Sequence, residues 1–451
     1  MKKPLYKGLL FLALIVFSAS TVFAQKETDY DPYAPILKYP RAQDPAQIEK
    51  RDREIFIARI LEQPFRPIGY ALGETAEWAE RTHLENKLTW AYTELTSHGI
   101  YPQLRRPPSD SFLAPMGLGA RVQIEKLLNF EESFVTVNAT GGWAPNINYA
   151  GTTVDLEGDY KIQSSSRPYY HNGSARYWRS SAENFYGIGQ NTSRGERSSY
   201  QPEEVWLEGG IGYDLNESNE LHGAVVYQRM NIGNGNRERI GKIKEHFPVG
   251  IPGIDGGDLI GLVNKWIHDG RDHKTDPRKG GIQTLEFSYF HDTDGKDFQY
   301  LKMAGSVAHF FPILSDRRVL ALRIRVEKNQ ELGGGEIPFY NLARLGGSSI
   351  RDGSELLRSY AFNRYFDEGL IVANAEYRYN IYEYGNFAGD AVALFDVGEV
   401  FEEIHDFGFD ELKFSYGSGL NLKYKRHTIL FFSLARGNEG WAARVHTHAS
   451  F

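Results

Sequence analysis

The feature that most constrains this chain is a period-two alternation of apolar and polar residues, which begins at about residue 111 and continues to the end. In one such segment Ile371 and Ala375 fall on one face, and Asn374 and Glu376 fall on the other. Successive side chains of a strand point to opposite faces, so the alternation predicts strands with one apolar and one polar face. We therefore expect an all-β fold. Similar segments lie at 284–289, 320–327 and 412–424.

Two architectures place such strands favourably. In a soluble sandwich the apolar face meets a second sheet, and in a transmembrane barrel it meets lipid while the polar face lines the lumen. The spacing of the strands favours the barrel, because short turns at 216–219 and 313–316 alternate with long loops at 233–256 and 331–357. Strand spacing predicts an antiparallel transmembrane β-barrel of about 16 strands, an even number as in single-chain bacterial barrels.

The first residues have the pattern of a secretion signal. Lys2, Lys3 and Lys7 precede an apolar stretch from Leu9 to Phe17, and the small residue Ala24 is a suitable cleavage site. The apolar stretch is too short for a stable transmembrane helix. We therefore predict a signal peptide at 1–24, removed on export, and a transmembrane β-barrel at 111–451 located in the bacterial outer membrane.

The intervening segment 25–110 is expected to be a periplasmic leader with two helices. Asp44 is a typical N-cap for the first, and the second is expected at about 74–98. These helices could dock a partner, plug the lumen or brace the barrel mouth, with Trp78 and Trp90 as anchors. A short, weakly patterned strand is expected near 101–106.

Composition excludes several functions. The net charge is -7, and it becomes -10 once the three lysines of the predicted signal peptide are removed, so nucleic acid is a poor partner. The chain has no cysteine, Gly-rich phosphate loop or nucleophile elbow. His446 and His448 share a face of the last expected strand and could bind a metal, although two lumen histidines are the simpler interpretation. We expect that the protein binds no metal or cofactor and is not an enzyme. An outer-membrane hydrolase is the least favoured of three functions considered, after the two given below.

Several motifs in and after the second long loop, and one earlier stretch at 185–189, occur in a characteristic order. Through the order and spacing of these motifs, the sequence resembles the BamA/TamA superfamily, the bacterial surface-antigen barrels, from about residue 116 to residue 451. The motifs are Phe185-Tyr186-Gly187-Ile188-Gly189, Pro338-Phe339-Tyr340, Leu345-Gly346-Gly347-Ser348-Ser349, Leu357-Arg358-Ser359-Tyr360, Asn363-Arg364-Tyr365-Phe366-Asp367, Ala375-Glu376-Tyr377-Arg378-Tyr379 and Phe395-Asp396-Val397-Gly398.

The resemblance implies that the long loop folds back into the lumen and is held there by an arginine. Arg358 would pair with Glu376 and Asp396, which the alternation places on the polar faces of two successive strands. We call this predicted trio the latch. Arg351 is a rival for the arginine, because Gly347 and Arg358 are a few residues further apart than in the family pattern. Gly346, Gly347, Tyr360 and Gly398 belong to the same loop and strand motifs.

Two further features stand out in the sequence. Asp269, Arg271 and Asp272, followed by His273, form a charged cluster between two strands that either braces the barrel or is a solvated turn. The last strand is expected at 440–451, ending in Phe451. A terminal aromatic residue of this kind is typical of outer-membrane barrels, where it serves as an insertion signal.

The resemblance also indicates a function. Family members that insert or export proteins carry POTRA domains, which mix strands and helices, whereas the segment upstream of this barrel is predicted to be helical. We expect an integral outer-membrane barrel that assists insertion or translocation of other components through a lateral seam between its first and last strands. Expected partners are the lipid bilayer, the barrel-assembly machinery and a client protein. The alternative is a passive or substrate-specific channel, or a purely structural barrel.

Overall fold

The computed structural model describes most of the chain from Ile100 onwards. The predicted signal peptide at 1–24 and the predicted helices, with Trp78 and Trp90, lie outside the described residues. The described ranges are 100–105, 117–124, 129–130, 133–146, 151–164 and 168–451, the last with gaps at 238–239, 248–249, 349–353, 385, 409–410 and 447–449.

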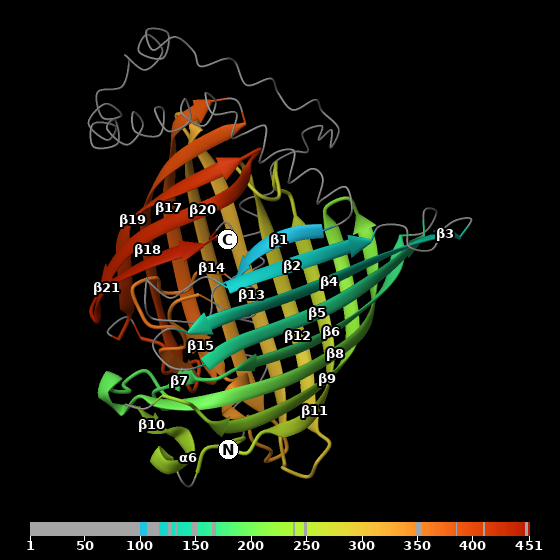
Figure 1. Ribbon diagram of the computed structural model, residues 1–451, viewed down its shortest axis with the longest axis vertical. Helices are drawn as coiled ribbons and strands as arrows, with labels where there is room; N and C mark the ends of the chain where they lie inside the picture. Colours follow the sequence, from blue (N-terminus) through green and yellow to red (C-terminus); the bar gives the residue numbers. More distant parts are fainter. Residues whose placement is uncertain are drawn as a thin grey trace.

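Within these ranges the fold is the predicted one. Sixteen strands follow one another as antiparallel neighbours in a single sheet (Figure 1). They are β1 (Ile100–Arg105), β2 (Gly117–Ile124), β4 (Ser133–Asn146), β5 (Gly151–Ser164), β6 (Tyr169–Ser180), β8 (Ser198–Asn216), β9 (Asn219–Asn234), β11 (Gly257–Asp269), β12 (Gly280–Asp292), β13 (Gln299–Ile313), β14 (Ser315–Glu331), β17 (Gly369–Tyr384), β18 (Phe387–Phe401), β19 (Lys413–Tyr424), β20 (His427–Gly437) and β21 (Gly440–His446).

Short elements decorate the loops of this sheet. They are β3 (Asn129–Phe130), β7 (Glu183–Phe185), η2 (Arg194–Glu196), β10 (Gly241–Lys242), α6 (Ile243–His246), η3 (Phe339–Asn341), β15 (Ala343–Leu345) and β16 (Tyr365–Asp367). Among the described residues, no helix is long and apolar enough to cross a membrane.

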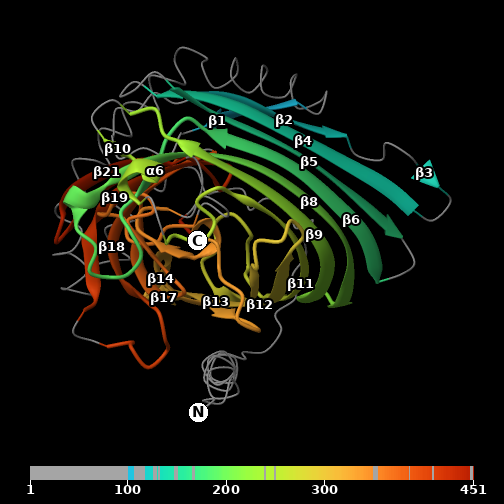
Figure 2. The same cartoon turned by 90° about the horizontal axis from the view of Figure 1, so that it is seen from below.

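The sheet curls around an interior that contains loop segments (Figure 2). Its two edges are β1 and β21, since each of them has a hydrogen-bonded strand on one side only in the described part of the chain. These edge strands are also the shortest of the sixteen, with 6 and 7 residues. In the described part of the chain, the two edges of the sheet are therefore its two shortest strands.

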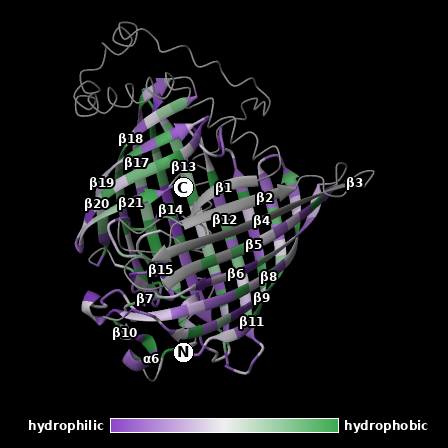
Figure 3. Cartoon of the chain, in the orientation of Figure 1, coloured by the Kyte–Doolittle hydropathy of each residue, from purple (hydrophilic) through white to green (hydrophobic). Residues whose placement is uncertain are grey.

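The two faces of the sheet differ in chemistry as the alternation predicted. On β14, Leu322 and Ile324 point outward and are 39% and 46% exposed, whereas Arg323 between them is buried at 4%. Green and purple residues accordingly alternate along the strands in Figure 3. An outward apolar face and an inward polar face match a barrel whose outside contacts lipid.

The connections confirm the predicted division into short turns and long loops. β8 and β9 are joined through Asn216 and Asn219, and β13 and β14 through Leu314, which has a positive φ of 64°. At the opposite end, residues 235–256 and 332–368 form the two long loops, the second of which continues beyond its predicted end at residue 357. By the usual rule the short-turn end faces the periplasm.

Two expected boundaries need correction. The sheet already includes Ile100–Arg105, before the predicted barrel boundary at residue 111, because the weakly patterned strand near 101–106 pairs with β2 along its whole length. The last described strand covers Gly440–His446, and Ser450 and Phe451 do not belong to a strand, contrary to the expected extent 440–451. The ring of Phe451 lies inside the barrel on Phe310, with the ring centroids 6.2 Å apart. Phe451 thus packs on an aromatic residue of the lumen wall. It would lose this contact if the strand continued to the end of the chain.

Candidate functional site

The most elaborate feature of the interior is the segment 332–368 between β14 and β17, which we call the lumen loop. Within it, β15 and β16 pair antiparallel, and an isolated bridge joins Ser348 to Glu355. Figure 2 shows the orange segments of this loop inside the curled sheet. The loop therefore has its own hydrogen-bonded structure, and it does not cross the lumen as an irregular strand.

The two glycines of the loop motif make this structure possible. Gly346 and Gly347 have φ values of 116° and 69°, which L-residues rarely adopt. A Cβ on Gly346 would lie 2.5 Å from the carbonyl oxygen of Ala361. The turn also lets Gly347 N–H donate to Leu357 O at 2.9 Å, which places the next residue, Arg358, at the tip of the loop.

Gly346→Ala is expected to destabilise the barrel by about 1–3 kcal/mol, because alanine at this φ is strained and its Cβ would clash with the backbone. The measurement is the urea midpoint of the protein refolded in phospholipid vesicles. Gly334→Ala is the matched control, since Gly334 also has a positive φ of 87° in this loop, but open space surrounds its Cβ position. Equal losses in the two variants would contradict a role for close packing at Gly346.

The structure brings Arg358 together with Glu376 of β17 and Asp396 of β18. The guanidinium donates to Asp396 from Nε at 3.0 Å and from Nη2 at 2.6 Å, and its Nη1 donates to Glu376. The backbone N–H of Arg358 also donates to Asp396 Oδ2 at 3.0 Å. All three side chains are almost completely buried, at 0%, 1% and 0% exposure for Arg358, Glu376 and Asp396. Arg351, the rival, lies outside the described residues.

Neighbouring polar side chains complete the hydrogen bonding of the two carboxylates. Arg378 Nε donates to Glu376 Oε2 at 2.8 Å, and Asn374 Nδ2 donates to Asp396 Oδ1 at 2.8 Å. Arg323 on β14 holds the oxygen of Asn374 through Nη2 at 2.7 Å. Because buried charges are stable only when paired and hydrogen-bonded, this arrangement can hold the loop tip in one position.

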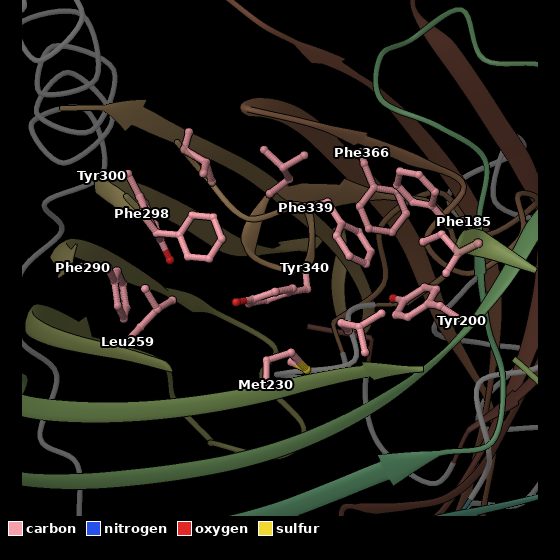
Figure 4. Packing of buried hydrophobic residues seen from close by; sticks show 14 of the residues in the cluster. Phe185, Tyr200, Met230, Leu259, Phe290, Phe298, Tyr300, Phe339, Tyr340 and Phe366 are labelled. Carbon is pink, nitrogen blue, oxygen red and sulfur yellow. The ribbon is translucent and has the colours of Figure 1, made fainter. Parts of the chain in front are cut away.

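A second, apolar contact fixes the other part of the lumen loop. Phe339 lies among Phe185, Tyr200 and Phe366, with ring centroids 5.0–5.3 Å apart for the pairs Phe185–Phe366, Phe185–Phe339 and Tyr200–Phe339 (Figure 4). Tyr340 continues this cluster toward the wall formed by β9, β11, β12 and β13. Edge-to-face aromatic packing therefore attaches the loop to the long-loop end of the barrel, away from the charged tip.

The remaining motif residues also contact this assembly. Gly189 N–H donates to Phe366 O at 2.7 Å, so the Phe185–Gly189 motif closes over the loop. Tyr360 is 1% exposed and packs near Tyr365, with ring centroids 5.9 Å apart. Gly398 lies on β18, where a Cβ would approach Ile371 O to 2.6 Å, so glycine permits close approach of β17.

The charged cluster at the turn between β11 and β12 also has defined partners. Arg271 forms a bidentate pair with Asp269, with two contacts of 2.8 Å. Asp272 accepts the backbone N–H groups of Arg278 and Lys279 at 2.9 and 3.2 Å. These bonds give the turn a compact shape, which agrees with a brace better than with a solvated turn.

The same turn reaches across the inside of the sheet. Asp276, which sequence reasoning missed, accepts a hydrogen bond from Lys423 of β19 at 3.0 Å, and Lys423 also contacts Asp390 of β18 at 2.5 Å. Arg426, beyond β19, donates to the carbonyl oxygen of Asp276 at 2.8 Å. The strands β13, β14 and β17 lie between β12 and β18 in the sheet. These contacts therefore link two parts of the wall that are not neighbours in the sheet.

The sequence signals for the missed residues were partial. Asn374, Arg378 and Lys423 fall on the polar faces that the alternation identified, but period alone does not select which polar residue has a fixed partner. Glu355 and Arg444 have no local signal, because their contacts depend on how the loop folds back. His446 is buried against Glu355, with Nε2 2.8 Å from Oε1, and His448 lies outside the described residues. In the described part of the chain, no group of three His, Cys, Asp or Glu side chains could hold a metal ion.

These observations define a class of protein: an outer-membrane β-barrel with a structured loop bound in its lumen. The chain belongs to the Omp85 superfamily, because its sequence matches the Omp85 superfamily domain over residues 135–426, more than half of its length. This confirms the resemblance inferred from the motifs. At the family level, membership supports a role in insertion or translocation.

Solved structures of similar fold agree with this assignment. BamA from Haemophilus ducreyi lacking POTRA domains 1–3 matches with a TM-score of 0.51 and 15% identity, covering 80% of this chain and 76% of that chain. CdiB from Escherichia coli matches with 0.51 and 12%, covering 77% and 61%. CdiB from Acinetobacter baumannii matches with 0.50 and 10%, covering 77% and 58%. The chain thus spans about three fifths of each CdiB chain, and these identities establish the fold alone.

Proposed function

We propose that this protein assists the insertion or translocation of other outer-membrane components through a lateral seam between β1 and β21. The observation that carries the proposal is the pair of edge strands, each hydrogen-bonded on one side only among the described residues. A six-residue strand can form only about six cross-strand hydrogen bonds with a partner. A junction of β1 and β21 could therefore be no longer than the six-pair ladder of β1 and β2, which is the shortest between neighbours among the sixteen strands described.

An open edge presents unpaired backbone groups, which are costly in lipid and are satisfied by an incoming strand. A client strand could pair with such an edge by β-augmentation. In this proposal the lumen loop, held by Arg358, Glu376 and Asp396, keeps the interior filled while the seam is closed. The aromatic cluster around Phe339 supports this role, because it packs the loop against the wall at the long-loop end.

The test is a disulfide scan of the seam in living cells. One cysteine is placed in turn at each position of β1 and the second at Ala443 of β21, in a chain that has no other cysteine. We expect cross-linking to lower the amounts of several other outer-membrane proteins and to slow growth. The amounts should recover when the disulfide is reduced.

A matched control places the disulfide between strands that are already paired. Ala373 of β17 and Val397 of β18 are register partners on the outer face, so cross-linking them should leave other outer-membrane proteins unchanged. If the seam and control disulfides have the same effect, the lateral seam is not the working part. If cross-linked seams leave growth and the outer-membrane proteins unchanged, the protein is a closed barrel, and single-channel conductance in planar bilayers becomes the relevant measurement.

A further inference from the structure

The last strand is attached to the lumen loop as well as to its neighbour in the sheet. β21 pairs only with β20 among the described strands, from Gly437–Gly440 to Phe431–His446. Its inward side chains Arg444 and His446 are 3% and 9% exposed, although they lie on an edge strand. Burial of charged or polar side chains at an edge requires partners, and the lumen loop supplies them.

Arg444 binds the backbone of the loop tip. Its Nε donates to the carbonyl oxygen of Arg358 at 2.7 Å, and its Nη2 donates to the carbonyl oxygen of Tyr360. The guanidinium also lies over the ring of Phe362, 4.4 Å from its centroid. Arginine stays charged and carries only donors, and these two carbonyl oxygens are acceptors for two of them.

A second contact lies one inward position further along the strand. His446 Nε2 lies 2.8 Å from Glu355 Oε1, and the hydroxyl of Ser348 donates to the same oxygen at 2.9 Å. Glu355 is completely buried. Burial by itself raises the pKa of Glu355, but His446, Arg444 and Arg358 outweigh it and bring the pKa to about 2. The carboxylate therefore stays ionised at neutral pH and keeps its hold on β21.

The residues after the strand add a third contact. Glu355 N–H donates to Ser450 O at 3.2 Å. The ring of Phe451 lies 5.0 Å from the guanidinium carbon of Arg323 and 5.4 Å from that of Arg378, whose Nε is bonded to Glu376. The segment that follows β21 thus contacts the same group of buried charges that holds Arg358.

Together these contacts connect the last strand to the wall formed by β17 and β18. The side chain of Arg358 binds β17 and β18, while its carbonyl oxygen is bound by Arg444 of β21. The connection bypasses β19 and β20, which lie between β18 and β21 in the sheet. The position of β21 therefore depends on the loop tip in addition to the ladder with β20.

We propose that Arg444 is a positioning residue that makes the last strand, β21, follow the state of the lumen loop. When the tip is bound to Glu376 and Asp396, Arg444 holds β21 against the interior. When the tip leaves, β21 loses the two hydrogen bonds from Arg444 to the loop and can move outward. The movement of β21 does not depend on the proposed function. Only its role in opening the seam for a client rests on that function.

The test measures the position of β21 directly. Spin labels are attached at Ala443→Cys on β21 and Ala393→Cys on β18, both on the outer face, in protein reconstituted in phosphatidylcholine vesicles. The distance between the labels is measured by pulsed electron resonance. Arg444→Met removes the bonds to the loop and keeps an apolar stem. We expect the mean distance to shift by about 5 Å, the spacing of one strand, with a broader distribution.

Two controls separate this effect from general damage. Arg436→Met alters an arginine of similar position on β20, but its guanidinium lies over Trp441 on the outer face, 5.6 Å from the ring centroid. It should leave the β21 distance unchanged. A second label pair, Ala393→Cys with Phe287→Cys on β12, should keep its distance in Arg444→Met if the rest of the barrel is intact.

An unchanged β21 distance in Arg444→Met would overturn the proposal, and so would an equal shift in Arg436→Met. If Arg444→Met does not fold, Arg444→Lys replaces it, because lysine keeps the charge but lacks the guanidinium fork that bonds both carbonyl oxygens. The same shift or its absence decides the question there. Because the distance is measured without a client, the coupling can hold even if the seam disulfides prove harmless in cells, so the two proposals fail separately.

Discussion

Arg358→Ala is expected to lower the free energy of unfolding of the barrel by about 3–5 kcal/mol. The loss arises because Glu376 and Asp396, at 1% and 0% exposure, would keep their charges without the guanidinium that compensates them. It is measured from urea unfolding in phospholipid vesicles, with resistance of the folded band to heating in gels as a second readout.

The double variant Arg358→Ala with Asp396→Ala is expected to lose less free energy of unfolding than the sum of the losses in the two single variants. Part of the cost of Arg358→Ala is the unpaired carboxylate of Asp396, which the second change removes. An additive double variant would mean that the pair is not energetically coupled. The cycle therefore distinguishes the paired arrangement from two independent packing losses.

Arg229→Ala is the matched control for this measurement. Arg229 also forms a bidentate pair with an aspartate, Asp258, with contacts of 3.0 and 2.8 Å, but its side chain is 54% exposed. Exposed pairs contribute little because solvent screens them. If Arg229→Ala destabilised the protein as much as Arg358→Ala, burial would not explain the effect.

Lys423→Met is expected to lower the free energy of unfolding by about 3 kcal/mol. Lys423 is 3% exposed and is shared by Asp276 of the β11–β12 turn and Asp390 of β18, which would be left as two buried carboxylates without it. We further expect the turn to leave the wall, so that a cysteine at Thr275 reacts faster with a water-soluble maleimide. Lys244→Met is the control, since Lys244 contacts Asp255 at 2.7 Å with both side chains exposed. Equal reactivity of the Thr275 cysteine with and without Lys423 would contradict the brace.

The contribution of Lys423 should depend on pH. Burial raises the pKa of Asp276, but Lys423, Arg278 and Arg426 outweigh it, so the net pKa lies below the ordinary value of aspartate. A carboxyl with a depressed folded-state pKa contributes stability above its unfolded pKa, and that stability is lost as the pH falls through the folded value. The difference in stability between the natural protein and Lys423→Met should therefore be full at neutral pH and shrink in strong acid. A difference that stays constant down to that range would show that the charge of Asp276 is not involved.

The alternation of residues predicted which way the two latch carboxylates face, whereas the returning loop and its arginine were inferred from the family resemblance. Glu376 and Asp396 could be assigned to the polar face because facing depends only on whether a position is odd or even within a strand. The boundaries were less well predicted. The first strand has too little contrast between its faces to mark its start, and Phe451 left the strand pattern for an aromatic contact that no local rule describes.

Sequence by itself determined the strand periodicity, the number of long strands and the division into short turns and long loops, because each depends on neighbours within a few residues. Only the tertiary structure decided which charges meet. Arg358 and Asp396 are 38 positions apart, and Asp276 and Lys423 are 147 apart. Such pairs form where the curled sheet and the returning loop bring distant polar faces into one dry interior. There an unpaired charge is costly, so partners are selected by the three-dimensional path of the whole chain.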